Sequence, residues 1–394
     1  MLRRYAELIV GFGANVQPGQ IVAVSTEPGK EPLTRAIAAA AYRAGASFVD
    51  VNSFDTYIKR ARIEFSQEDY LEVVPSWYAE RMLALGEQRC ARVGLTGPAA
   101  PGLLDDLDPQ RVGRDRLPFL PEAVTVVNAR TTNWTAAPCP TPEWAALVHP
   151  SLDPADALAR LWEQIAHVCR LDEDDPVAAW RSRMDHVGAA ADALDAARFD
   201  ALHFEGPGTD LRVGLLPGSK WITARFSTID GIAHFPNLPS EETFSAPDPA
   251  RVDGVVRCTK PLVLSGSIVR GLTLRFEGGR AVEIEAESGG PTLSALLDRD
   301  DGARRLGEVA LVDGDGRVGP LQTTFYDTLL DENAASHIAF GQGYEFSVDE
   351  SDVARVNKSG LHVDVMIGGE DVRVTGVTAA AERVLVLERG AWKI

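Results

Sequence analysis

His362 and Asp364 form a His-Val-Asp motif at the start of the apolar stretch His362–Ile367, which is typical of a β-strand. Residues two apart on a strand point to the same face, so this imidazole and this carboxylate could bind one divalent cation together. Because so short a motif arises by chance, a half-buried strand with a hydrogen-bonded histidine is the simpler interpretation. The motif gains meaning only beside other candidate ligands.

A second pair, Glu332 and His337, lies five residues apart and follows the apolar stretch Phe325–Leu330. This placement predicts a boundary between two elements. Both side chains are candidate metal ligands. The alternative is an ordinary helix start, where acidic residues interact favourably with the helix dipole.

Three more glutamates stand beside apolar residues. Glu308 lies at the head of the apolar stretch Leu306–Val312, where burial is costly unless the carboxylate is paired or coordinated. The alternative for Glu308 is a strand end in solvent. Glu241 and Glu242 are adjacent on an extended segment and face opposite sides, so at most one of them can easily serve a shared site.

Four carboxylates and two imidazoles could hold two cations about 3.5–4 Å apart, provided that one carboxylate bridges them. Oxygen and nitrogen ligands without thiolate suit zinc, cobalt or manganese. The spacing of these residues does not show that they converge.

The composition excludes several classes of partner. The 394 residues include 57 acidic and 39 basic side chains, which gives a net charge of −18 that repels nucleic acid and anionic membranes. No continuous apolar run reaches the ~18 residues of a membrane span. Widely spaced cysteines without a Cys-x-x-Cys pair indicate reduced thiols, so we expect a cytoplasmic protein. The cysteines are Cys90, Cys139, Cys169 and Cys258.

The first half of the chain is typical of an α/β fold. A strand, a helix and a strand follow one another and indicate a parallel βαβ unit, and a later strand and two helices opened by Asp-Pro come after it. The predicted strands are Ile21–Val24, Ser47–Val51 and Val124–Asn128, and the predicted helices include Glu31–Ala44, Asp153–Leu171 and Asp175–Leu194.

The second half is richer in turns, since 24 of the 35 glycines follow residue 200. Alternating stretches at Leu272–Phe276 and Val282–Ala286 flank Gly278-Gly279, which predicts a β-hairpin. We therefore expect an α/β N-terminal domain at residues 1–197 and a β-rich α+β C-terminal domain at residues 198–394, which carries the candidate ligands.

Five strings of the second half resemble the thermophilic-type metalloaminopeptidases of peptidase family M29, and the likeness extends over nearly the whole chain. The strings are Gly206-Pro-Gly-Thr-Asp-Leu211, Asn237-Leu-Pro-Ser-Glu-Glu-Thr-Phe244, Leu306-Gly-Glu-Val-Ala-Leu-Val312, Phe325-Tyr-Asp-Thr-Leu-Leu-Asp-Glu-Asn-Ala-Ala-Ser-His337 and His362-Val-Asp-Val-Met-Ile-Gly368. Their shared order makes the set far more specific than any one string.

This resemblance implies two divalent metal ions per chain, zinc or cobalt first and manganese or magnesium as alternatives. The implied ligands are Glu242, Glu308, His337, His362 and Asp364. Glu308 is the expected bridging carboxylate. Glu332 is expected to be a further ligand or a proton shuttle, and Tyr344 an active-site tyrosine.

The implied activity is removal of the N-terminal residue from peptides with a free N-terminus, by a cytoplasmic homodimer. Two departures from the family pattern, Val365 and Ser240, fall on no expected ligand. The stretch between Tyr344 and His362 looks shorter than in relatives, which leaves the side-chain preference open.

Two other classes compete with a peptidase. A mononuclear Fe(II) ring-cleaving dioxygenase of the 2,5-dihydroxypyridine type also resembles this family, but it needs only two histidines and one carboxylate. Glu242 and Glu308 would then be superfluous. A non-catalytic relative that keeps the fold and a stabilising metal is the other alternative, against which the intact ligand set and Tyr344 argue.

Overall fold

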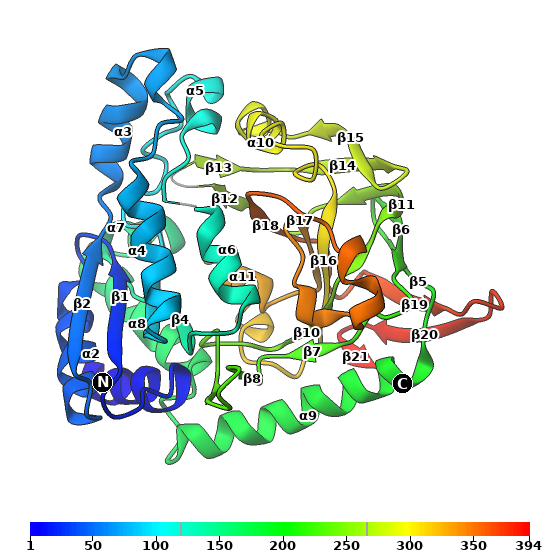
Figure 1. The fold of residues 1–394 in the computed structure, drawn as a ribbon. Coiled ribbons are helices and arrows are strands. Elements are labelled where there is room, and N and C mark those ends of the chain that lie inside the picture. The colour runs from blue at the N-terminus through cyan, green and yellow to red at the C-terminus, as the bar shows by residue number, and fades with distance from the viewer. Residues whose placement is uncertain (119, 265–266) are drawn as a thin grey trace.

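The computed structural model describes residues 1–118, 120–264 and 267–394. A four-stranded parallel sheet in the order β2-β1-β3-β4 organises the first half of the chain, coloured blue to green in Figure 1. Its strands are β1 Ile21–Thr26, β2 Phe48–Ser53, β3 Ala91–Thr96 and β4 Trp134–Pro138. The predicted βαβ unit is confirmed, because β1 and β2 are parallel and α2 connects them.

Helices surround this sheet. They are α1 Leu2–Leu8, which continues into a π-helical turn at Ile9–Gly13, then α2 Glu31–Arg43, α3 Thr56–Phe65, α4 Ser76–Glu87, α5 Pro109–Arg114, α6 Pro121–Asn128, α7 Pro142–Val148, α8 Pro154–Val168 and α9 Pro176–Ala197. Both predicted Asp-Pro helix starts are confirmed in position. The Asp175 carboxylate accepts a hydrogen bond from the N–H of Ala178, whereas the side chain of Asp153 makes no capping hydrogen bond.

The strand predicted at Val124–Asn128 is wrong, since these residues form the last turns of α6. Pro121 starts the helix, and Val126 packs closely against Gly86 of α4. The valines therefore serve a helix–helix contact. The later strand of this sheet is instead β4. Its residues, Trp-Thr-Ala-Ala-Pro, contain no run of β-branched apolar side chains, so the sequence did not indicate a strand there.

The second half contains two larger sheets. A five-stranded sheet has the order β18-β17-β16-β10-β7, and an eight-stranded sheet has the order β15-β14-β11-β6-β5-β19-β20-β21. The strands are β5 Ala201–Gly206, β6 Thr209–Leu215, β7 Ile222–Thr223, β8 Phe226–Ser227, β9 Ala233–His234, β10 Glu242–Ser245, β11 Pro247–Arg257, β12 Leu262–Leu264, β13 Ser267–Val269, β14 Thr273–Glu277, β15 Arg280–Glu285, β16 Leu306–Val312, β17 His337–Gly341, β18 His362–Met366, β19 Arg373–Val377, β20 Arg383–Glu388 and β21 Ala391–Trp392. Two short helices, α10 Gly290–Leu297 and α11 Thr328–Glu332, complete this half.

The predicted hairpin is confirmed as β14 and β15. Gly278 and Gly279 both have positive φ, +53° and +82°, which is what a two-residue turn of this kind requires.

The five-stranded sheet has an apolar face and a polar face because side chains alternate along each strand. Val309, Ile338, Phe340 and Val365 point into the core that this sheet shares with the eight-stranded sheet. Glu308, His337, His362 and Asp364 stand at the intervening positions and belong to the opposite face. The packing of the second half thus fixes which face carries the polar side chains.

The fold class is confirmed: helices flank a parallel sheet in the first half, and the second half is rich in antiparallel strands. The long helix α9 ends at Ala197, and β5 begins at Ala201. Phe235, Leu238 and Phe325 of the second half nevertheless join the hydrophobic core of the first half. The domain limits 1–197 and 198–394 therefore stay a proposal. Among the described residues, no helix has the length and apolar character needed to cross a bilayer.

Candidate metal centre

Strand register brings the predicted ligands together on one face of the five-stranded sheet. Glu308 on β16 lies opposite Ala339 on β17, and Ala339 lies opposite Asp364 on β18. Directly opposed residues of antiparallel strands share a face of the sheet. Glu308 and Asp364 therefore stand in one row across three strands.

The other predicted ligands occupy the same face by the same register. His337 on β17 lies opposite Ala310, two residues after Glu308, and Glu242 on β10 lies opposite Val312, four residues after Glu308. His362 is two residues before Asp364 and so points to the same side, as the His-x-Asp spacing predicts.

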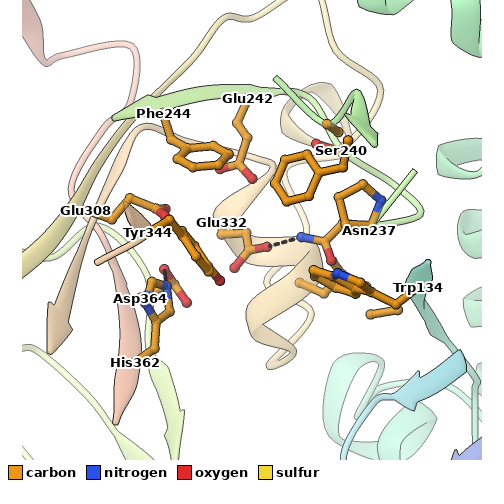
Figure 2. A pocket seen from close by; sticks show the side chains of 15 residues that line it. Trp134, Asn237, Ser240, Glu242, Phe244, Glu308, Glu332, Tyr344, His362 and Asp364 are labelled. Carbon is orange, nitrogen blue, oxygen red and sulfur yellow. Dashed lines mark hydrogen bonds and ion pairs between the residues drawn. The ribbon is translucent and has the colours of Figure 1, made fainter. Parts of the chain in front are cut away.

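These side chains form two groups of three that share one residue. Glu242, Glu308 and His337 form the first group, and Glu308, His362 and Asp364 form the second, with the donor atoms of each group within 4.8 Å of one another. Glu308 belongs to both groups, which is the position that a bridging carboxylate needs. Figure 2 shows Glu242, Glu308, His362 and Asp364 around one pocket.

The closest contacts within the groups join imidazoles to carboxylates. Nε2 of His337 lies 3.0 Å from Oε2 of Glu242 and 3.5 Å from Oε1 of Glu308. Nε2 of His362 lies 3.2 Å from Oδ1 of Asp364. Despite its short distance to His337, the buried Oε2 of Glu242 makes no hydrogen bond of acceptable geometry. An orphaned carboxylate oxygen among imidazole nitrogens fits a cation site better than a hydrogen-bonded cluster.

Backbone carbonyl groups orient both imidazoles. Nδ1 of His337 lies 3.1 Å from the carbonyl oxygen of Glu332, and Nδ1 of His362 lies 2.8 Å from that of Gln342. Nδ1 therefore donates in each ring, and Nε2 is the nitrogen that faces the carboxylates. Metal-binding histidines are usually fixed in this way by a hydrogen bond on the far nitrogen.

Burial and the neighbouring charges shift the pKa values of the candidate ligands in this pocket. Burial works against the protonated form of His337, yet Glu242 and Glu308 raise its pKa well above its usual range. The same balance, with Asp364 as the main partner, raises the pKa of His362 to about 10. Burial raises the pKa of Glu308. Since metal ions compete with protons for these donor atoms, a divalent cation would relieve both effects.

Glu332 lies beside the two groups and belongs to neither of them. The side-chain amides of Asn237 and Asn333 approach its Oε1 at 3.5 and 3.4 Å, and Figure 2 marks the contact with Asn237. Burial, together with the carboxylates of Asp364 and Glu242, raises the pKa of Glu332 well above its usual range. Glu332 thus faces the site, and its carboxylate contacts side-chain amides and no imidazole in the described structure.

The adjacent acids Glu241 and Glu242 separate as expected. Glu242 joins the first ligand group, and Glu241 turns away to Nη2 of Arg170 at 3.1 Å and Nε of Arg183 at 2.5 Å. Its backbone N–H donates to Oδ1 of Asn333 at 2.6 Å. Glu241 therefore anchors the segment that carries Glu242.

Tyr344 forms part of the pocket wall. Its ring centroid lies 5.8 Å from that of Phe244 and 5.4 Å from that of His362, and its hydroxyl end points into the pocket (Figure 2). Loss of water around the hydroxyl, and then the negative charge of Glu308, raise the pKa of Tyr344 well above its usual range. The phenol is therefore a hydrogen-bond donor at any working pH.

Some of the residues that line the pocket could not be selected by sequence reasoning. The pocket has a volume of about 210 Å³, and Trp134, Phe226 and Asn237 line it beside the acids. Asn237 lies in the same string as Glu242, which is a weak signal. Trp134 comes from β4, and nothing in its local sequence indicates that the first half of the chain reaches the site.

Comparison with known proteins agrees with this geometry. A family model described as thermophilic metalloprotease (M29) matches residues 1–392. The chain belongs to this family, so the protein is a metal-dependent peptide hydrolase, and the resemblance to the thermophilic-type metalloaminopeptidases is confirmed.

Individual relatives align along their full length. The chain is 42% identical to aminopeptidase T of Thermus aquaticus over 403 residues, covering 100% of this chain and 98% of the relative. It is 38% identical to aminopeptidase 2 of Geobacillus stearothermophilus, covering 99% and 97%. The solved structure of wild-type AmpT from Thermus thermophilus superposes with a TM-score of 0.88 at 40% identity, covering 100% of this chain and 99% of that one.

Proposed function

We propose that the protein is an aminopeptidase that uses two divalent cations to remove the N-terminal residue of a peptide. The observation that carries this proposal is the pair of donor groups that share Glu308. Glu242 and His337 would complete one cation site, and His362 and Asp364 the other. The oxygen and nitrogen donors suit zinc or cobalt, with manganese or magnesium as alternatives.

The cations supply Lewis acidity toward the scissile carbonyl group and lower the pKa of a water molecule toward neutrality. The chain itself must move the proton of that water to the leaving amine. Glu308 and Glu332 are the two candidates. Glu332 suits this role better, because it lies outside both donor groups and two amides orient its carboxylate.

Tyr344 would donate its hydroxyl hydrogen to the oxygen of the scissile carbonyl group as negative charge develops there. Its high pKa keeps the proton on the phenol, and its contacts with Phe244 and His362 hold the ring in place. A donor that is fixed before the reaction stabilises the transition state without reorganisation.

The free α-amine of the substrate would be recognised at the acidic lining of the pocket, by a cation or by a carboxylate. An N-acylated peptide would lose this interaction. With a volume of about 210 Å³, the pocket is smaller than the ~300–1,000 Å³ of typical ligand pockets. A space of this size suits one residue, as exopeptidase action requires.

The dioxygenase alternative is less well supported. Two histidines and one carboxylate suffice for a mononuclear iron site. Here Glu242 and Glu308 lie within 3.5 Å of Nε2 of His337, and Asp364 lies 3.2 Å from Nε2 of His362. One iron ion would leave buried carboxylates without a partner, which is energetically costly.

We also propose a cytoplasmic homodimer that acts on peptides and on neither nucleic acid nor membranes. All four cysteines are free and buried, and the net charge is −18. An apolar surface suited to a second copy lies on and after α3, where large side chains are more than half exposed. These side chains are Tyr57, Ile58, Phe65, Tyr70 and Trp77.

A test compares Leu-Ala-Ala with N-acetyl-Leu-Ala-Ala. We expect the protein to release leucine from the free peptide only, to lose this activity with a chelator and to regain it with Zn²⁺ or Co²⁺. Cleavage of both peptides, or activity that survives complete metal removal, would contradict the proposal.

A further inference from the structure

A second, larger cavity adjoins the same candidate ligands. Its volume is about 810 Å³, and Leu329, His362 and Asp364 line both this cavity and the smaller pocket. The candidate metal centre therefore lies where the two spaces meet. If the smaller pocket holds the residue before the scissile bond, as proposed above, the larger cavity is the space for the residues after it.

The larger cavity lies at the carboxyl edge of the parallel sheet in the first half. Its wall includes Thr26 at the end of β1, Asn52 near the end of β2 and Thr96 at the end of β3. In the order β2-β1-β3-β4, the strand β2 that follows β1 in the sequence lies on one side of β1, and β3 lies on the other side. Open α/β sheets bind their ligands in the crevice at such a switch point.

Three acidic groups of the wall already have partners in the protein, although neither oxygen of Asp115 makes a hydrogen bond of acceptable geometry. Glu27 pairs with Nζ of Lys30 at 2.6 Å, and Asp115 lies 3.4 Å from Nζ of Lys59. Asp327 accepts a hydrogen bond from the backbone N–H of Gly97 at 2.8 Å.

Two of the three cations in the wall are also engaged. Arg81 contacts Asp50 at 2.5 Å, and Lys59 contacts Asp115. Arg299 is different: within the described parts of the chain it forms no ion pair, and only its Nη2 donates, to the carbonyl groups of Gly113 and Asp115 at 3.0 and 3.1 Å.

The charged groups that act on Arg299 are Arg116 and the carboxylates of Asp115, Asp300 and Glu72, and each of these three acids has another partner. Arg62 adds a second cation to Asp115, with its Nε 3.1 Å from Oδ1, so two cations face one carboxylate. Asp300, the neighbour of Arg299, is occupied by Ser359 and the N–H of Gly360 at 2.9 and 2.8 Å. A guanidinium carries five N–H donors in a fork that matches a carboxylate, so Nε and Nη1 of Arg299 remain available for an anion.

We propose that the larger cavity binds the part of the peptide that follows the scissile bond, and that Arg299 binds the C-terminal carboxylate of that part. The inference rests on the proposed aminopeptidase activity and adds a substrate class. The preferred substrates are short peptides whose free C-terminus reaches Arg299 while their N-terminus lies at the metal centre.

The test measures KM and kcat for Leu-Ala-Ala, Leu-Ala-Ala-Ala and Leu-Ala-Ala-Ala-Ala, each as the free acid and as the C-terminal amide. For the wild-type protein with Zn²⁺ or Co²⁺, we expect the amide of the best length to have a KM about 10-fold above that of the acid, with similar kcat. Loss of one charge-assisted hydrogen bond is a change of this order.

In Arg299→Met, we expect the ratio of the two KM values to fall to about 1, whereas Arg299→Lys should keep most of it. Arg304→Met is the matched control. Arg304 lies on the same loop, contacts Asp298 at 2.7 Å and does not line the cavity, so its variant should keep the wild-type ratio. Thermal unfolding of each variant checks that it is folded.

Equal KM values for acid and amide at every length in the wild-type protein would overturn the carboxylate site and leave the aminopeptidase intact. An equal rise in both KM values for Arg299→Met would overturn it too. If the wild-type protein releases leucine from no peptide at all, the proposed function itself is contradicted.

Discussion

At the scale of single residues, Tyr344 is the clearest case of a side chain whose role can be separated from metal binding. Its hydroxyl group is surrounded by acids and its ring by Phe244 and His362. Tyr344→Phe removes only the donor and keeps the ring. We expect kcat to fall about 10²–10³-fold, because the developing oxyanion loses one fixed hydrogen bond.

The measurement is kcat on Leu-Ala-Ala together with the metal content of the variant, which should equal that of the wild-type protein. An unchanged kcat would remove Tyr344 from the mechanism.

Glu332 gives a second prediction at this scale. It lies outside both donor groups, so Glu332→Gln should keep the bound metal and lower kcat about 10²–10⁴-fold, the contribution of a positioned general base. Glu308→Gln is the comparison, and it should lower metal affinity as well, because Glu308 belongs to both groups. If Glu332→Gln loses metal to the same extent, Glu332 is a ligand and the proton carrier must be sought elsewhere.

The sequence predicted single residues well where a local rule applied. The alternation of a strand places His362 and Asp364 on one face, and it separates Glu241 from Glu242. Roles came from the resemblance to a family and from no physical rule. The environment of Glu332 could not be predicted, since Asn237 approaches it from a distant loop.

At the scale of elements, strand register assembles the site, and a glycine protects that register. Gly307 lies at a bulge between β16 and β17, immediately before Glu308. An added Cβ there would overlap the backbone of Gly341 and Gln342. We expect Gly307→Ala to lower the free energy of unfolding by about 1–3 kcal/mol, as overpacking typically does, and to weaken metal binding.

Chemical denaturation and metal titration measure these two effects. Gly369→Ala is the control, because a Cβ at Gly369 meets no atom within 4 Å. If Gly307→Ala binds metal as tightly as the wild-type protein, the prediction that this glycine maintains the strand register at the site is contradicted.

Elements were predicted where local patterns sufficed and missed where tertiary contacts decided. Gly278-Gly279 specified its hairpin because only positive φ closes such a turn. The valines of Val124–Asn128 favoured a strand, but packing against α4 determined a helix. The order of β10, β16, β17 and β18 could not be predicted, because long stretches of chain separate the strands that pair.

At the scale of the whole molecule, the two halves meet at a buried histidine. His234 on β9 packs near Trp134 on β4, with ring centroids 6.4 Å apart. Burial lowers its pKa from 6.5 to about 4, and its Nε2 lacks a hydrogen-bond partner. The folded state therefore disfavours the imidazolium, and this penalty grows as the pH falls from 6.5 toward 4.

Between about pH 7.5 and pH 4.5, His234 should cost the folded state roughly 2–3 kcal/mol. We expect His234→Gln to lose less stability than the wild-type protein over this range in urea unfolding. Identical pH dependence of His234→Gln and the wild-type protein would contradict the assigned burial.

The central claim is that Glu308 lies between two cations, and calorimetric titration of the metal-free protein with Co²⁺ or Zn²⁺ tests it most directly. The geometry predicts two ions per chain in the wild-type protein, with both sites weakened in Glu308→Gln. A single ion per chain, or two ions that bind unchanged without Glu308, would contradict it.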